Sequence, residues 1–122
     1  MNEMPAILGL AASAARHAAS RQAVIATNVA NADTPGFRAR DMDAFSPDDG
    51  FALRRTSAAH FAGATRTDAS HEIRDAGADP NGNTVDLEDQ VLRGIEAARV
   101  HDRAITVYRS SLDMLRASLG KR

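Results

Sequence analysis

The chain has 122 residues, no cysteine and a formal net charge of −1 at pH 7. This length allows one domain at most, and the charge argues against a nucleic-acid binder that works through bulk electrostatics, because such domains usually carry a basic patch. Alanine supplies much of the 43% apolar content, and an alanine side chain buries little area, so only a thin core is expected. Because disulfides cannot reinforce that core, the chain should depend on neighbouring proteins for its stability.

Residues 5–33 are predicted to form one helix. Pro5 suits its first turn, where a missing N–H group costs nothing. Apolar residues then recur at alternating spacings of three and four, which is the heptad pattern of a helix that packs along a partner, and Gln22 alone breaks it. Most of these side chains are small, so a partner helix could approach closely. The seam comprises Leu8, Ala11, Ala15, Ala18, Gln22, Ile25, Val29 and Ala32.

The segment Thr34-Pro35-Gly36 is predicted to end this helix in a tight turn. Proline at the second turn position presets φ, and glycine at the third accepts the positive φ of a type II turn. Because Thr34 precedes proline, it is disfavoured in the helical region, so the helix should end by about Asp33.

The middle segment, residues 38–83, is predicted to be mostly irregular and partly disordered. It is rich in small and polar residues, and short strands are conceivable only around residues 51–55 and 71–74. Residues 79–83 (DPNGN) resemble the start of a calcium loop, but glycine falls at the fourth loop position instead of the sixth, and Gln90 stands where a bidentate glutamate belongs. We therefore interpret this run as a turn that leads into the second helix.

Residues 86–119 are predicted to form a second, longer helix. Asp86 is a favourable N-cap, and Gly120 is a natural C-terminal stop. The same alternating spacing defines a second seam. It comprises Val91, Gly94, Ala98, His101, Ile105, Tyr108, Leu112, Leu115 and Leu119.

The expected fold is dominated by α-helix. Two long terminal amphipathic helices pair as an elongated, coiled-coil-like hairpin, and the insert between them is short, mostly irregular and at most marginally β. We divide the chain into residues 1–37 (first helix and turn), 38–83 (insert) and 84–122 (second helix), all within one structural unit. Such helices would still expose much apolar surface after pairing with each other.

No catalytic, cofactor or metal site is expected. The four histidines are far apart in the sequence, and none has the i, i+4 partner of a helical zinc site. Asp41 and Asp43 are interpreted as solvated loop carboxylates and not as an acid–base pair, because nothing in the sequence predicts a pocket around them. Neither a nucleic acid nor a small-molecule substrate is expected as a partner.

Several blocks of this sequence resemble the bacterial flagellar rod, hook and other axial proteins, and in particular the proximal rod proteins. The blocks are residues 28–37 (NVANADTPGF), 39–42 (ARDM), 79–88 (DPNGNTVDLE) and 108–116 (YRSSLDMLR). Their order and the short chain favour a proximal rod protein over hook and distal rod proteins, which carry larger middle domains. The motif residues carried over are Asn28, Asn31, Thr34, Pro35, Gly36 and Phe37.

The resemblance implies a structural axial protein that polymerises in the periplasm into the rod that carries motor torque. It implies export through the flagellar type III apparatus, without a cleaved signal peptide. The implied partners are other copies, other rod proteins, and the basal-body adaptor, MS-ring and export gate at the base of the rod. The alternative, from a different class, is a helical-hairpin adaptor or export chaperone that binds one partner helix.

Overall fold

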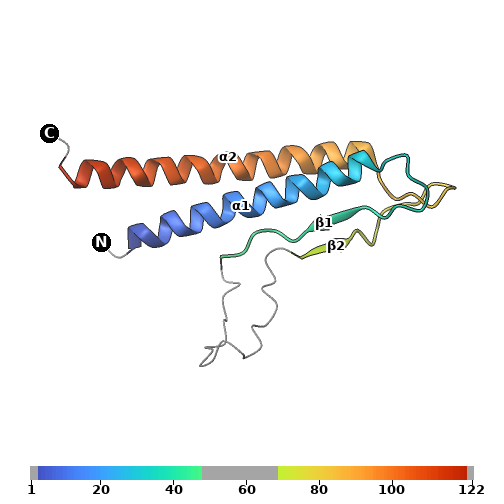
Figure 1. Cartoon of the computed structure of the whole chain (residues 1–122), viewed down its shortest axis with the longest axis horizontal. Coiled ribbons are helices and arrows are strands. Elements are labelled where there is room, and N and C mark those ends of the chain that lie inside the picture. Colours follow the sequence, from blue (N-terminus) through green and yellow to red (C-terminus); the bar gives the residue numbers. More distant parts are fainter. Residues whose placement is uncertain (1–2, 48–68, 121–122) are drawn as a thin grey trace, which may run out of the picture.

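The computed structural model describes residues 3–47 and 69–120. Two long helices, α1 (Glu3–Ala30) and α2 (Leu87–Ser118), pack side by side in opposite directions as an elongated hairpin (Figure 1). At 1.5 Å per residue they are about 42 and 48 Å long. We call the end that holds the start of α1 and the finish of α2 the open end, and the opposite end, formed by residues 31–39 and 73–86, the turn end. The predicted helical hairpin is confirmed.

Helix α1 ends three residues before the predicted limit. The chain leaves the α-helix after Ala30, and residues 31–33 form turns in which the N–H of Asn31 donates to the C=O of Asn28 at 3.0 Å. The Thr34–Phe37 turn follows, closed by the N–H of Phe37 donating to the C=O of Thr34 at 3.2 Å. Gly36 has a φ of 73°, as the predicted turn requires.

Helix α2 begins and ends at the predicted signals. The side chain of Asp86 accepts hydrogen bonds from the N–H groups of Glu88 and Asp89, which satisfies two otherwise unpaired donors of the first turn. At the other end Gly120 has a φ of 69°, and its N–H donates to the C=O of Ala117 at 3.2 Å.

A two-stranded antiparallel sheet is formed by β1 (Arg40–Met42) and β2 (Ser70–Glu72). Its register pairs Arg40 with Glu72 and Asp41 with His71. Strand β1 also packs against α1, so the sheet is fixed to the hairpin (Figure 1). Strand β2 overlaps the short strand considered at residues 71–74. The strand considered at residues 51–55 lies outside the described residues, as does the part of the insert at residues 48–68, on which the expected partial disorder is not tested.

The core between the helices is thin and built largely from alanine. Among the described residues, six of the eight buried apolar side chains are alanines, joined by Ile25 and Met42. Polar residues are the largest fully buried side chains, namely Gln90, Asn28, Asn83 and Ser111. Hydrogen bonds therefore specify this packing as much as apolar area does. No described helix is both long and apolar enough to cross a bilayer.

Candidate functional site: the polar junction at the turn end

Asn28 connects three elements at the turn end. Its side-chain Nδ2 donates to the C=O of Arg40 at 2.6 Å and to Oε1 of Gln90 at 2.8 Å, while its Oδ1 accepts from the N–H of Arg40 at 3.0 Å. Both Asn28 and Gln90 are 1% exposed. Since a buried amide without partners costs about 1–3 kcal/mol, this triple contact sets the relative position of α1, β1 and α2.

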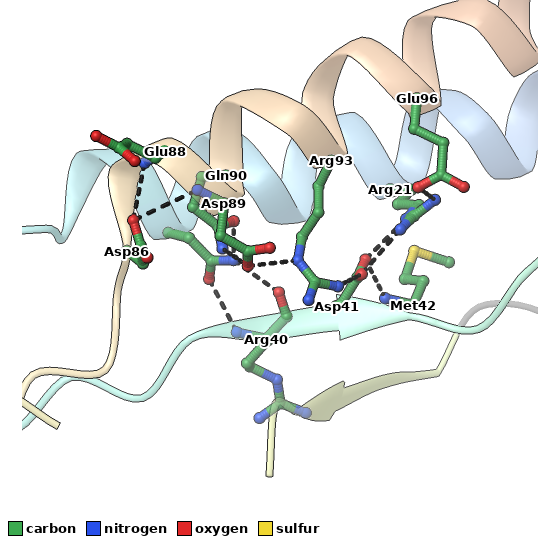
Figure 2. Close-up of polar contacts among 11 residues, drawn as sticks. Arg21, Arg40, Asp41, Met42, Asp86, Glu88, Asp89, Gln90, Arg93 and Glu96 are labelled. Atoms are coloured by element: carbon green, nitrogen blue, oxygen red, sulfur yellow. Dashed lines mark hydrogen bonds and ion pairs between the residues drawn. The ribbon is translucent and has the colours of Figure 1, made fainter. Parts of the chain in front are cut away.

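Asp41 forms the second part of the junction (Figure 2). The guanidinium of Arg21 binds it in a two-pronged arrangement, with Nε to Oδ1 at 2.8 Å and Nη2 to Oδ2 at 2.9 Å. Arg93 of α2 donates to the same Oδ2 from the other side and also binds Asp89 at 2.6 Å. Arg21 reaches Glu96 at 3.3 Å as well. One carboxylate on β1 thus holds an arginine from each helix.

The environment of Asp41 keeps its carboxylate ionised. Burial is the largest single influence and acts to raise the pKa, but the hydrogen bonds from Arg21, the Met42 N–H and Arg93 together outweigh it and lower the pKa to about 2. The hydrogen bond to Asp41 likewise raises the pKa of Arg21 against the opposing effect of burial. Because the carboxylates and guanidinium groups of the junction are paired with one another, the junction holds the elements together and offers no unpaired acid or base.

Asn83 fixes the carboxyl end of α1 from the second loop of the turn end. Its side-chain Nδ2 donates to the carbonyl oxygens of Asn31, Ala32 and Thr34 at 2.8–2.9 Å, and its Oδ1 accepts from the N–H of Val85 at 2.7 Å. The last carbonyls of a helix lack partners within the helix. Asn83 is 1% exposed. Its side chain supplies hydrogen-bond donors to the carbonyl groups just beyond the end of α1, although Asn83 follows them by about 50 residues in the sequence.

The two loops of the turn end also pair through their backbones. The N–H of Gly36 donates to the C=O of Asn81 at 3.0 Å, and the N–H of Thr84 donates to the C=O of Phe37 at 3.0 Å. The hydroxyl of Thr84 accepts from the N–H of Ala39 at 2.8 Å. A Cβ atom on Gly82 would lie in ordinary contact, 3.5 Å from the Cα of Gly36, so the φ of 82° at Gly82, and not a lack of space, is what favours glycine there.

The motif residues expected from the resemblance all lie at this junction or next to it. Asn28 is buried, and Asn31 accepts a hydrogen bond from the Thr34 hydroxyl at 3.2 Å while its own Nδ2 donates to the C=O of Thr27. Phe37 is half-buried, and Pro35 is exposed in the turn. The motif therefore comprises the end of α1, the turn after it, and the side chain of Asn28, which holds β1 against α1.

The predicted seam residues of α1 mostly face α2. Ala11, Ala15, Ala18 and Ile25 are buried and Leu8 is half-buried, whereas Val29 is 45% exposed.

On α2 the buried residues are displaced by one position from the predicted heptad. Gln90, Ala97, Ala104 and Ser111 are buried, and each directly precedes a predicted seam residue. All predicted seam residues of α2 are more accessible to solvent than these four buried residues. Val91 and Leu119 are 59% and 82% exposed, and the half-buried members are Gly94, Ala98, His101, Ile105, Tyr108, Leu112 and Leu115.

One interpretation made from sequence needs correction. Asp41 is not solvated, because it is 3% exposed and held by two arginines, while Asp43 is exposed as expected and lies 3.7 Å from His71. His17 of α1 is also buried, at 7% exposed, with its ring centroid 5.7 Å from that of Phe45.

The other junction residues, Arg21, Asn83, Gln90 and Arg93, carry no sequence signal of burial, since their partners lie 20 to 75 residues away. Within residues 3–47 and 69–120, no group of three or more histidine or acidic side chains is placed to hold a metal ion. Every buried side-chain nitrogen or oxygen in that part of the chain has a hydrogen-bond partner.

Comparison with known proteins agrees with the position of this motif. Residues 8–38, which end at the turn, match the sequence model of the family described as "Flagella basal body rod protein". The chain is 30% identical to the flagellar basal body rod protein FlgB of Agrobacterium fabrum over 112 residues, which cover 83% of each chain.

Two further relatives are flagellar basal body rod proteins FlgB. The chain is 31% identical to that of Salmonella typhimurium over 109 residues, 77% of this chain and 78% of the relative. It is 33% identical to that of Escherichia coli over 102 residues, 72% and 74% of the two chains. The helical hairpin, the turn motif and this similarity along most of the sequence lead to one conclusion: the chain belongs to the FlgB family of flagellar basal body rod proteins.

Proposed function

We propose that this chain is a structural subunit of the proximal rod of the flagellar basal body, where it self-assembles through its helices and transmits motor torque. The observation that carries this proposal is the apolar surface that the hairpin leaves uncovered. Ten large apolar side chains of the described residues are exposed, and six of them lie on α2, its first residue included. Surface of this kind on a slender hairpin is typical of a subunit whose neighbours complete its packing.

The predicted seams divide between two roles in this proposal. The small residues of α1 face α2 and hold the hairpin together. The larger seam residues of α2 flank that contact and are accessible, and we assign the contact with neighbouring subunits to them. The chief members are Val91, Ala98, Ile105, Tyr108, Leu112, Leu115 and Leu119, with Val29 on α1.

The polar junction suits a subunit that bears load. Charge-assisted and buried hydrogen bonds have narrow geometric tolerance, so they resist sliding of α1 along α2 better than an alanine seam does. We infer that the junction fixes the direction in which residues 38–83 leave the hairpin, and that residues 1–37 and 84–122 act as one axial unit.

Under this proposal the partners are other copies, other rod proteins, and the adaptor, MS-ring and export gate at the base of the rod, in the periplasmic part of the basal body. The protein works without catalysis, cofactor or metal. The charged groups at the junction support this, since each is neutralised by its neighbours.

The test is Leu112→Asp, which places a carboxylate at a half-buried position beside the hairpin contact. Burying an unpaired charge at a subunit contact costs several kcal/mol, so we expect secreted subunits, no rods and no motility. Ser110→Asp is the matched control, because Ser110 is exposed and the same charge there should leave motility intact.

Equal swimming of the two variants would contradict the seam assignment. Rods that form normally without this chain would contradict the function itself and favour the adaptor or chaperone. Circular dichroism of both variants checks that the hairpin is still folded.

A further inference from the structure

The second loop of the turn end contains a chemically reactive pair, Asn81-Gly82. Of the five asparagines in the sequence, Asn81 is the one that precedes glycine. An asparagine side chain can be attacked by the backbone nitrogen of the next residue, and glycine allows this attack most readily because it has no Cβ to hinder the approach. Asn81 is exposed, so water reaches its side chain. The pair is therefore a candidate site of spontaneous deamidation.

The reaction needs water and no other reagent. The nitrogen of Gly82 attacks Cγ of Asn81 and gives up its proton, the Cγ–Nδ2 bond breaks, and Nδ2 leaves with that proton as ammonia. The product is a succinimide ring, which water then opens by adding hydroxyl to one ring carbonyl carbon and returning a proton to the Gly82 nitrogen. Opening at Cγ gives aspartate. Opening at the main-chain carbon gives isoaspartate, in which the main chain runs through the side chain.

The folded loop holds both reacting groups away from the geometry of attack. Residues 79–82 form a turn in which the N–H of Gly82 donates to the C=O of Asp79 at 2.8 Å. Asn81 is the third residue of that turn. Because no described residue other than glycine has a positive φ, the turn is type I, with φ about −90° and ψ about 0° at Asn81. The side-chain Oδ1 of Asn81 is engaged as well, since it accepts from the N–H of Asn83 at 3.0 Å.

Ring closure would break the pairing of the two loops. The nitrogen of Gly82 can reach Cγ only by rotation about the Cα–C bond of Asn81, which takes the Gly82 N–H away from Asp79. The same rotation moves the C=O of Asn81, which accepts from the N–H of Gly36 at 3.0 Å. The N–H of Asp79 also donates to the C=O of Asn83 at 2.8 Å and closes the loop. The reaction therefore requires local opening of the turn end, so its rate falls with the population of the open loop.

We propose that Asn81 is a deamidation site controlled by the fold: it reacts in chains whose turn end is open and is protected once the two loops have paired. The isoaspartyl product does not restore that pairing. It lengthens the main chain between Asn81 and Asn83 by one atom, whereas Asn83 must place its amide 2.8–2.9 Å from three carbonyl oxygens beyond α1. Building on the proposed function, a subunit that ages before it folds loses the junction that fixes its helices in the rod.

Mass spectrometry measures the reaction in a single peptide. Trypsin releases residues 75–93 together, and fragmentation of this peptide assigns the mass gain of an amide-to-acid change to Asn81 or to Asn83. Chains are incubated at mildly alkaline pH in concentrated guanidinium chloride, in buffer once circular dichroism has shown the helices, and within isolated basal bodies. We expect deamidation at Asn81 to be at least about tenfold faster in the denaturant than in the two folded samples.

The outcomes separate the site, its control by the fold and the proposed function. Absence of deamidation at Asn81 in the denaturant would overturn the site. Equal rates in the denatured and folded samples would overturn the control by the fold. Absence of the peptide from basal bodies would contradict the proposed function alone, because the purified chain still tests the deamidation.

Substitutions identify the source of the protection. Asn83→Ala removes the three amide contacts beyond α1, so it should raise the rate in buffer toward the rate in denaturant and leave the latter unchanged. Ser110→Ala, at an exposed position of α2, should change neither rate. Gly82→Ala should slow the reaction in denaturant, because a Cβ hinders the attack. Equal protection of Asn81 in the Asn83→Ala and natural chains would overturn the part assigned to the junction.

A last comparison separates the effect of isoaspartate from that of charge. Chain aged in denaturant and refolded should contain an isoaspartyl fraction with a lower urea midpoint than fresh chain. Treatment with protein isoaspartate methyltransferase and S-adenosylmethionine, which returns isoaspartate to aspartate, should restore the midpoint. Asn81→Asp carries the same charge on a normal main chain and should fold like the natural chain, and Asn81→Gln should have the same midpoint before and after ageing. An unchanged midpoint of the isoaspartyl fraction would overturn the effect assigned to isoaspartate.

Discussion

Asn28 and Arg40 exchange two hydrogen bonds, one in each direction, between a side-chain amide and a backbone. Nδ2 of Asn28 donates to the C=O of Arg40 at 2.6 Å, and Oδ1 accepts from the N–H of Arg40 at 3.0 Å. The carboxamide thereby takes the place that a neighbouring strand would occupy along β1. A helix side chain in this way satisfies the strand edge opposite β2 and anchors it to α1.

Replacing Asn28 by alanine should destabilise the fold more than replacing any other motif side chain. It leaves the N–H and C=O of Arg40 and Oε1 of Gln90 without their partner in a buried position, which we expect to cost about 2–4 kcal/mol. Urea unfolding followed by circular dichroism measures this loss. Asn31→Ala is the control, since Asn31 is half-buried and close to solvent, and a loss equal to that of Asn28→Ala would contradict the central role of Asn28.

Stability should fall in acid because of Asp41. Its pKa is lowered from 3.8 to about 2 in the folded chain, so its contribution is present above pH 4 and is lost as the pH falls toward 2. With allowance for screening we expect this contribution to be about 1–2 kcal/mol.

The variants Asp41→Asn and Asp43→Asn separate this effect from general acid unfolding. Asp41→Asn should lose stability at neutral pH and show a weaker decline between pH 4 and 2, because the titrating carboxylate is gone. Asp43 is exposed, so Asp43→Asn should follow the natural chain at every pH. Parallel pH–stability curves for all three chains would show that the Asp41 contacts contribute nothing.

The amide of Asn83 should be irreplaceable by a carboxylate of the same shape. Asn83→Asp keeps the acceptor for Val85 but turns a negatively charged oxygen toward the three carbonyls of Asn31, Ala32 and Thr34, so it should be more damaging than Asn83→Ala. We expect loss of motility and a fall in urea midpoint.

Asn81→Asp is the matched control for that change. Asn81 is exposed, and its Oδ1 only accepts a hydrogen bond from the N–H of Asn83 at 3.0 Å, which a carboxylate does equally well. Near-natural stability is therefore expected, and a larger loss for Asn81→Asp than for Asn83→Asp would contradict the proposed role of Asn83.

Gly36→Val should be worse than Phe37→Leu. No atom lies within 4 Å of a Cβ built on Gly36, so the cost arises from its φ of 73°, which a β-branched residue resists. For L-residues the left-handed region costs about 1–2 kcal/mol, more for valine, whereas leucine at residue 37 retains most of the apolar contact. Motility and basal-body yield of the two variants measure the difference.

Gly36→Asn distinguishes backbone strain from other effects at this position. Asparagine tolerates a positive φ better than other side chains, so this variant should retain more motility than Gly36→Val. If the asparagine and valine variants failed equally, the strain explanation would be wrong.

The sequence alone determined the two helices, the limits of α2 and the turn after α1, because those features depend on a few neighbouring residues. The Asp86 cap, the positive φ of Gly36 and the stop at Gly120 all follow from local backbone chemistry, and all three are confirmed. The family motif could be identified for the same reason, since its residues are contiguous.

Tertiary structure alone decided which polar residues are buried and which positions of α2 face α1. Asp41, Asn83 and Gln90 belong to residue types that are usually exposed to solvent. Their burial is favourable only because they form hydrogen bonds with partners 20 to 62 residues away in the sequence. The heptad pattern selects the larger apolar residues of α2. The alanines of α1 instead bring the helices close, and close approach favours the small side chains of Ala97, Ala104 and Ser111, one position earlier, so the larger residues flank the contact and are available to a neighbouring subunit.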